Sequence, residues 1–285
     1  MEQITEYKAD EIGHWSEMKL DIIREYADAY SRVLGSKNQR RLYHVYIDGF
    51  SGGGVHVSKT KQELIPGSPL IALGVNPPFK EYHFIDLDSQ KIKALSDIVA
   101  GKSNAHLYEG DCNSILLDKV FPQVTYEQYR RGLCLLDPYG LHLNWEVIKT
   151  AGQMKSIEIF LNFPVMDMNR NVLWRDKNDE RIRPEDIQRM SAFWGDDSWE
   201  GLAYTPKAQQ SLFGGVEMQK EDNETITEGF RDRLKNVAGF KFVPKPLPMR
   251  NSTGATVYYL FFASHNEVGN RIAEHILKTY RLKGT

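Results

Sequence analysis

Residues 46–54 read Tyr46-Ile47-Asp48-Gly49-Phe50-Ser51-Gly52-Gly53-Gly54, and this stretch decides the predicted fold. The mostly apolar residues 43–47 predict a strand that ends on a carboxylate and continues directly into a glycine-rich turn. Glycines let the backbone adopt left-handed angles and approach a ligand closely. In a parallel α/β sheet, such a turn lies at the carboxyl edge of the strands, where ligands bind. The stretch therefore predicts a ligand site.

The spacing of the glycines excludes two common kinds of site. A phosphate-binding P-loop closes with a Lys-Ser or Lys-Thr pair, whereas this turn closes with Gly54-Val55-His56-Val57. A dinucleotide-binding fingerprint needs glycines at relative positions one, three and six. Counting from Gly52 and Gly54, the sixth position is Val57, so neither pattern is present.

The pattern that remains is Asp-x-Phe-x-Gly-x-Gly, formed by Asp48, Phe50, Gly52 and Gly54. It resembles motif I of the class I S-adenosylmethionine-dependent methyltransferases. The resemblance implies that S-adenosylmethionine is the cofactor and that Asp48, Gly49, Phe50 and Gly52 hold its methionine part. A strand followed by a glycine-rich turn also occurs in sheets that bind no ligand, and this alternative stays open for the stretch taken alone.

The length and composition of the chain limit the classes of protein to which it can belong. With 285 residues and a hydrophobic content of 41%, the chain has room for one large α/β domain or for one domain with an insertion. No apolar run approaches the roughly 18 residues of a membrane-spanning helix, and the first residues lack the pattern of a signal peptide. The two cysteines, Cys112 and Cys134, form no metal-ligand spacing. We therefore expect a cytoplasmic protein that neither associates with a membrane nor binds a metal ion.

The charge of the chain gives no general attraction to nucleic acid. There are 36 basic and 38 acidic residues, hence a formal net charge of −2, whereas nucleic-acid-binding proteins usually present a basic face. Five basic residues nevertheless flank the glycine turn in the sequence: Lys37, Arg40, Arg41, Lys59 and Lys61. They form either a local basic groove or an ordinary solvated surface.

Strands and helices alternate along most of the chain. An amphipathic helix is predicted at 15–34, followed by strands at 43–47, 82–85, 105–108, 133–136 and 157–163 with helices at 68–75, 88–100, 112–121 and 143–154. Such alternation predicts a parallel, doubly wound sheet. A helix at 223–237, strands at 240–243 and 256–263 and a helix at 266–280 complete the chain. The last two strands predict an antiparallel hairpin, which is similar to the ending of the seven-stranded class I methyltransferase (Rossmann-like) sheet.

The alternation stops between about 165 and 222. This segment holds Trp174, Trp194 and Trp199, three of the five tryptophans. It is either a lid over the sheet edge with stacking aromatics or a helical subdomain whose tryptophans fill its own core. We therefore divide the chain into an N-terminal helical segment (1–40), a cofactor-binding half (41–164), an inserted lid or substrate subdomain (165–222) and the C-terminal part of the sheet (223–285).

Acidic residues also follow the second and third strands. Asp86 is assigned to the ribose, because a carboxylate at this place can accept hydrogen bonds from both hydroxyls. Leu87 is a candidate for packing against the adenine, and Asp88 is better explained as a helix N-cap. Asp111 and Cys112 resemble a pair of residues in class I methyltransferases, an acidic side chain and the next backbone amide, that hydrogen-bond to the edge of the adenine. The alternative is that Asp111 is only a helix N-cap, because Gly-Asp before a helix is a good capping sequence.

The fourth strand ends in Asp137-Pro138-Tyr139-Gly140. Methyltransferases that act on exocyclic amines carry Asp/Asn-Pro-Pro-aromatic here. This resemblance implies that Asp137 and the Pro138 carbonyl accept the amine hydrogens while Tyr139 stacks on the base. An aromatic amine is a poor nucleophile because its lone pair is delocalised into the ring. Methyl transfer to such an amine therefore depends mainly on the positioning of the amine and on electrostatic stabilisation. This motif has one proline instead of two, and in this it resembles the motif of tRNA guanine-N2 methyltransferases more than that of adenine-N6 enzymes. The alternative is that Asp-Pro-Tyr-Gly is an ordinary turn that binds no ligand.

The order of motifs along the whole chain is similar to that of the three-Cys-motif partner family, which is methyltransferase-like. The motifs are His14-Trp15-x-x-x-Lys19-Leu20, the glycine turn, Gly67-Ser68-Pro69-Leu70, the Asp-Pro-Tyr-Gly turn, Asn162-Phe163-Pro164 and Tyr259-Leu260-x-Phe262-Ala263-Ser264. The resemblance implies a partner, a cysteine-motif protein encoded nearby. The leading hypothesis is a methyltransferase acting on an exocyclic amine of a base in RNA, DNA or a nucleoside. The alternative is a non-catalytic S-adenosylmethionine-binding partner or scaffold.

Overall fold

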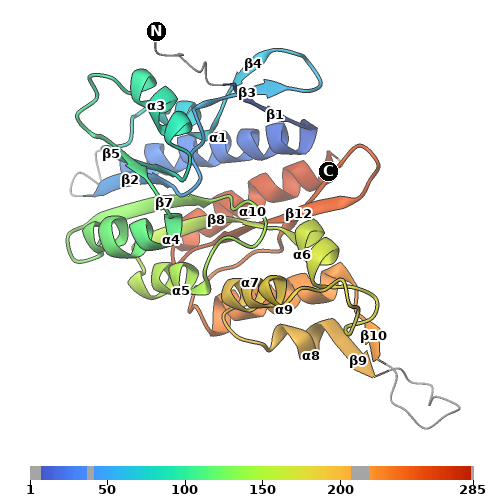
Figure 1. Cartoon of the computed structure of the whole chain (residues 1–285). Coiled ribbons are helices and arrows are strands. Elements are labelled where there is room, and N and C mark those ends of the chain that lie inside the picture. Colours follow the sequence, from blue (N-terminus) through green and yellow to red (C-terminus); the bar gives the residue numbers. More distant parts are fainter. Residues whose placement is uncertain (1–7, 37–41, 207–217, 284–285) are drawn as a thin grey trace, which may run out of the picture.

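A computed structural model describes residues 8–36, 42–206 and 218–283 of the chain. A seven-stranded sheet runs through the molecule (Figure 1), with the strand order β11-β12-β8-β7-β2-β5-β6. Its strands are β2 (Tyr43–Asp48), β5 (Glu81–Asp86), β6 (Ala105–Glu109), β7 (Arg130–Leu136), β8 (Ile157–Phe163), β11 (Leu247–Arg250) and β12 (Thr256–Ala263). Strands β8, β7, β2, β5 and β6 pair in parallel, whereas β12 runs antiparallel to β8. The predicted mostly parallel, doubly wound sheet with an antiparallel last strand is confirmed.

Helices cover both faces of the sheet, because successive residues of a strand point to opposite sides. One face packs against α1 (His14–Leu34), α2 (Ser68–Leu73), α3 (Ser89–Ile98) and α10 (Glu267–Leu282). The other face packs against α5 (Trp145–Met154) and against α4 (Cys112–Ile115), which continues through a π-helical turn (Leu116–Val120) and a 3-10 turn (Phe121–Gln123). In the central strand β2, Tyr46 packs in the core on the first of these faces, whereas Val45 and Ile47 pack in the core on the second.

No helix in the described part of the chain has the length and apolar character needed to cross a membrane.

The sixth strand of the sheet lies later in the chain than the sequence predicts. The predicted strand at 240–243 is wrong, since Phe242 forms only an isolated bridge with Ser264. The strand that pairs with β12 is β11, in the stretch predicted to be a proline-containing loop. An edge strand leaves one row of its amides unpaired. Pro248, which has no amide hydrogen, is therefore tolerated in β11 at the edge of the sheet.

A small second sheet, which the sequence analysis missed, lies beside the glycine turn. β3 (Val55–Ser58) and β4 (Leu64–Pro66) form an antiparallel hairpin, and β1 (Asp10–Ile12) pairs in parallel with β3. The hydroxyl of Ser58 donates to the Glu17 carboxylate of α1 at 2.6 Å, which ties the hairpin to the helix. Strands of three or four residues are too short to show a clear period in the sequence.

The described part of the segment 165–222 packs on the same core as the main sheet. It contains α6 (Val165–Asn171), α7 (Pro184–Trp194), α8 (Trp199–Ala203) and the strand pair β9 (Tyr204–Pro206) and β10 (Met218–Lys220), and α9 (Asn223–Asn236) follows. Trp194 and Trp199 are buried in one cluster with Phe230 of α9 and with α5. Trp174 is half-buried, with the Arg181 guanidinium 3.8 Å from its ring centroid. Two of the three tryptophans therefore fill the core, and the domain boundaries at 165 and 222 stay a prediction.

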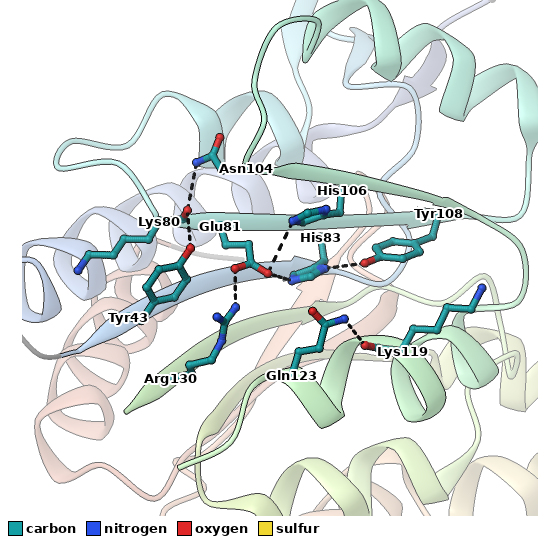
Figure 2. A network of polar contacts seen from close by, with 10 residues as sticks. All are labelled: Tyr43, Lys80, Glu81, His83, Asn104, His106, Tyr108, Lys119, Gln123 and Arg130. Carbon is teal, nitrogen blue, oxygen red and sulfur yellow. Dashed lines mark hydrogen bonds and ion pairs between the residues drawn. The ribbon is translucent and has the colours of Figure 1, made fainter. Parts of the chain in front are cut away.

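A polar network on one face of the sheet connects β5 with β6 and β7 (Figure 2). Glu81 of β5 accepts a hydrogen bond from Arg130 of β7, and its Oε1 lies 2.8 Å from Nε2 of His83. Nδ1 of His83 lies 3.1 Å from the hydroxyl of Tyr108 in β6. Burial lowers the pKa of His83 to about 4, although the nearby carboxylate of Glu81 acts to raise it.

In the part of the chain that the structure describes, no group of His, Cys, Asp and Glu side chains is arranged to hold a metal ion.

Candidate active site

A cavity of about 400 Å³ opens at the carboxyl edge of the main sheet. The ends of β2, β5, β7 and β8, the start of α1 and strand β1 border it. Six of the predicted site residues line it: Phe50, Gly52, Asp86, Asp137, Pro138 and Tyr139. Its volume is in the range of small-molecule sites. The tertiary structure thus brings the glycine turn and the Asp-Pro-Tyr turn, which are far apart in the sequence, into one cavity.

The glycine turn faces this cavity through Gly52. The φ angle of Gly52 is +63°, and a Cβ at this position would meet no other atom within 4 Å. A side chain here would therefore extend into the open space of the cavity. The Gly52 amide donates to Oδ2 of Asp86 at 2.8 Å, while Oδ1 of Asp86 accepts from the Asp88 amide at 2.9 Å. Asp86 thus connects two turns and presents its carboxylate at the cavity wall.

Asp48 supports the glycine turn from behind the cavity wall. It is fully buried and does not line the cavity. Its Oδ1 accepts from the Phe50 amide at 3.2 Å, and its Oδ2 accepts from the Tyr46 hydroxyl at 3.4 Å. Burial raises the pKa of Asp48 to about 7, against hydrogen bonds from Ser68 and Phe50 that lower it. In this position Asp48 orders the backbone of the turn, and its direct contact with a cofactor stays a prediction.

Four other predicted residues lie outside the cavity wall: Gly49, Leu87, Asp111 and Cys112. Gly49 packs on Cys112, because a Cβ at Gly49 would lie 2.9 Å from the Cys112 sulfur. Asp111 is the N-cap of α4 and accepts from the Ser114 amide at 3.0 Å, which is its alternative structural role. Leu87 is 76% exposed. The predicted contacts of these residues with an adenine stay predictions.

Asp137 is held from two sides at the cavity wall. Lys19 of α1 forms an ion pair with its Oδ2. Nδ2 of Asn162, near the end of β8, donates to its Oδ1 at 2.7 Å. The side chain of Lys19 is only 8% exposed, whereas that of Asp137 is 28% exposed. Because a carboxylate offers about four lone-pair positions, Asp137 keeps acceptor capacity for a further donor in the cavity.

Lys19 is the main residue of this site to which the sequence analysis assigned no role. A signal was present, because Lys19 follows Trp15 by four residues and precedes Ile22 by three, which places it on the apolar face of α1. A lysine on a buried face is rarely left without a partner. Its partner Asp137 lies 118 residues away in the sequence, so only the fold could identify the pair.

Pro138 and Tyr139 of the Asp-Pro-Tyr-Gly turn line the cavity. The hydrogen bonds of the described residues include none to the Pro138 carbonyl. The side chain of Tyr139 is 70% exposed, and the Lys91 ammonium lies 5.6 Å from its ring centroid. Gly140 has a φ of +54°, and a Cβ there would lie 2.7 Å from Oδ2 of Asp167. Glycine at this position therefore permits both the turn and the close approach of α6.

Both signs of charge line the cavity. Lys91 pairs with Asp10 of β1 at 2.6 Å. Lys59 and Arg170 also line the cavity, and neither forms an ion pair within the described ranges. Of the basic residues predicted to flank the glycine turn, Lys37, Arg40 and Arg41 lie outside the described residues, and Lys61 is exposed. The basic character near the site is therefore local and rests on Lys59 and Arg170, which have no carboxylate partner among the described residues.

Comparison with solved structures finds similarity at the level of the fold. The structure is similar to that of protein LPL1258 from Legionella pneumophila str. Philadelphia 1 over 93% of this chain and 94% of that chain, with a TM-score of 0.53 and 13% identity. It is also similar to an S-adenosylmethionine-dependent methyltransferase from Clostridium acetobutylicum over 85% of this chain and 91% of that chain, with a TM-score of 0.38 and 10% identity. No protein-family model and no curated protein matches the sequence. The strand order and the similarity over nearly the whole chain define an α/β protein with a Rossmann-like, doubly wound sheet.

Proposed function

We propose that the protein is an S-adenosylmethionine-dependent methyltransferase that acts on an exocyclic amine of a base in nucleic acid or in a nucleoside. The observation that carries this proposal is that one cavity is lined both by the glycine turn with Asp86 and by the Asp137-Pro138-Tyr139 turn. The first set of groups suits a cofactor that contains a ribose, and the second suits a planar amine. Both lie at the carboxyl edge of the sheet, where α/β proteins bind their ligands.

The residues around Gly52 fit the proposed cofactor. The missing side chain at Gly52 leaves open space against the backbone, which lets a ligand approach closely. The carboxylate of Asp86 is held by two backbone amides, so it is oriented before a ribose arrives. When bound, S-adenosylmethionine supplies an electrophilic methyl group. Gly52, Phe50 and Asp86 are the residues that would contact it.

The other half of the cavity fits an amine on a planar ring. Asp137 can accept one hydrogen of an amine, and so can the Pro138 carbonyl, which accepts no hydrogen bond from the described residues. Two acceptors placed in this way favour a pyramidal nitrogen, whose lone pair is no longer delocalised into the ring. The exposed ring of Tyr139 is available to stack on the base. Lys19 and Asn162 hold Asp137 in place, so the acceptor is oriented before the substrate binds.

A nucleic-acid substrate is supported by the local charge. Lys59 and Arg170 line the cavity without a carboxylate partner in the described part of the chain, and phosphate groups are natural partners for such cations. The net charge of −2 means that this attraction acts only near the site.

Methyl transfer from labelled S-adenosylmethionine tests the proposal. Three proteins are incubated with separate RNA, DNA, nucleoside and protein fractions: the wild type, Tyr139→Ala and the control Tyr129→Ala. Tyr129 is also exposed, at 51%, but it does not line the cavity. We expect label in a nucleic-acid or nucleoside fraction with the wild type and the control. Tyr139→Ala should transfer at least about tenfold less, equivalent to about 1.4 kcal/mol, while binding the cofactor normally in calorimetry. Label in the protein fraction alone would contradict the substrate class.

One observation favours a second function. Asp137 is already engaged by Lys19 and Asn162, as expected if the pair only stabilises a non-catalytic S-adenosylmethionine-binding scaffold for a cysteine-motif partner. Under this function, Asp137→Ala binds the cofactor with unchanged affinity, and the wild type labels no fraction. Co-purification with a cysteine-motif protein encoded nearby would then identify the partner.

A further inference from the structure

A second cavity lies at the opposite, amino edge of the main sheet. Its volume is about 420 Å³, and it shares no lining residue with the candidate active site. It lies between the C-terminal half of α1, the starts of β7 and β8, and the first turns of α10. Residue 269 is a glycine, and a Cβ there would lie 2.8 Å from Oε1 of Glu158. The close approach of α10 to the floor of the cavity therefore depends on Gly269.

Tyr30 in the wall of this cavity has an unpartnered hydroxyl. The side chain is only 6% exposed, and its hydroxyl has no hydrogen-bond partner among the described residues. An unsatisfied buried polar group costs about 1–3 kcal/mol. Burial raises the pKa of Tyr30, Glu158 adds to this effect, and Arg131 acts against it. Glu158 and Arg131 are therefore the charged groups that act on this hydroxyl.

Glu158, the acidic residue of the cavity, is itself satisfied. Its carboxylate accepts hydrogen bonds from the hydroxyls of Tyr26 and Ser264, the latter at 3.0 Å. Burial raises its pKa to about 7. A group with this pKa is about half neutral near pH 7. It therefore repels an anion less than an ordinary carboxylate would.

Three cations line the same cavity: Arg131, Lys155 and Lys241. None of them forms an ion pair with a carboxylate in the residues that the structure covers, and Glu158 is the single acidic residue among the described lining residues. The guanidinium of Arg131 lies 3.7 Å from the ring centroid of Tyr126, so it is held in place by stacking. Lys155 ends α5 with a φ of +58°, a position that glycine or asparagine usually occupies.

Apolar and aromatic side chains form the rest of the wall. They are Tyr26, Val33, Leu34, Leu42, Tyr126, Val268 and Ile272. A cavity with apolar walls and a few convergent polar groups is the usual form of a small-molecule site.

We propose that this amino-edge cavity binds a small aromatic anion, a planar ring that carries one phosphate or carboxylate group. Its ring packs among the apolar walls, and its anionic oxygen accepts hydrogen bonds from the Tyr30 hydroxyl and the Arg131 guanidinium. Charge-assisted hydrogen bonds of this kind are about twice as strong as neutral ones. The proposal is independent of methyl transfer, because it uses no residue of the candidate active site.

Calorimetry on the full chain with two probes, phenyl phosphate and benzoate, tests the proposal. Phenol and inorganic phosphate serve as ring-only and anion-only controls. We expect at least one of the ring-bearing anions to bind with a Kd below about 1 mM, in the weak range for small ligands, and at least tenfold more tightly than either control. The preferred probe then distinguishes a phosphate ligand from a carboxylate ligand.

Substitutions locate the binding. Tyr30→Phe should weaken it by about tenfold, a loss typical of one charge-assisted hydrogen bond, while leaving the Tm unchanged or higher because an unsatisfied hydroxyl is removed. Arg131→Met and the more exposed Lys241→Met should also weaken it. Tyr82→Phe, at a buried tyrosine outside both cavities, and Lys59→Met, in the first cavity, should have no effect.

Three results would overturn the proposal: no binding of either ring-bearing anion, equal binding of phenol or phosphate alone, or binding that neither Tyr30→Phe nor the two cation substitutions change. If Tyr30→Phe stabilises the protein and no probe binds, the cavity is a packing void. These outcomes do not depend on methyl transfer, so the proposed function and this proposal fail separately.

Discussion

The ion pair between Lys19 and Asp137 can be tested by its contribution to stability. Removing one partner of a fully buried pair costs about 3–5 kcal/mol, because the other charge is left without compensation. The Asp137 side chain is 28% exposed, whereas that of Lys19 is 8% exposed, so water can partly replace a lost partner at Asp137 but hardly at Lys19. We therefore expect Lys19→Met to cost about 1–2 kcal/mol and Asp137→Ala about 3 kcal/mol.

A double-mutant cycle measures the coupling between the two residues. The double variant Lys19→Met/Asp137→Ala leaves no uncompensated charge, so it should cost less than the sum of the single variants by about 1–2 kcal/mol. Urea denaturation without cofactor gives the four free energies of unfolding. The exposed pair of Glu146 and Lys149 on α5, whose charged atoms lie 3.3 Å apart, is the matched control and should couple by no more than about 0.5 kcal/mol. Equal coupling in the two pairs, or a larger cost for Lys19→Met than for Asp137→Ala, would refute the reasoning.

Three further substitutions have defined outcomes. Gly52→Val forces a β-branched residue into left-handed angles and fills the cavity, so calorimetry should show at least about tenfold weaker S-adenosylmethionine binding, equivalent to about 1.4 kcal/mol; unchanged affinity would remove Gly52 from the cofactor site. Glu158 has a pKa of about 7 in the fold and 4.5 ordinarily, so its contribution to stability is present below pH 4.5 and lost as the pH rises to 7. Between pH 4.5 and pH 7, the free energy of unfolding of Glu158→Gln should therefore rise by about 3 kcal/mol relative to that of the wild type. If the free energies of unfolding of the two proteins change in parallel with pH, the raised pKa of Glu158 is wrong. His83 has a pKa of about 4 against 6.5, so its contribution is present above pH 6.5 and lost as the pH falls to 4; His83→Gln should flatten this loss by about 3 kcal/mol, and an equally steep loss would mean that His83 is not responsible.

The sequence by itself determined the alternating order of strands and helices and the places where acidic residues follow the strands. Both features are local. A strand such as β2, buried on both faces, shows a mostly apolar run, and α1 shows the period of a helix. Parallel strands place their carboxyl ends at one edge. The presence of Phe50, Gly52, Asp86 and Asp137 in one cavity therefore agrees with the parallel sheet that the alternation predicts.

Only the tertiary structure decided which distant residues meet. Pro248 made residues 247–250 look like a loop, and only the edge position of β11 allows a proline there. The same holds for the site. Lys19 reaches Asp137 across 118 residues of sequence. In the wall of the second cavity, Gly269 of α10 lies against the side chain of Glu158 of β8. Such contacts depend on the packing of whole elements, which no local pattern of residues contains.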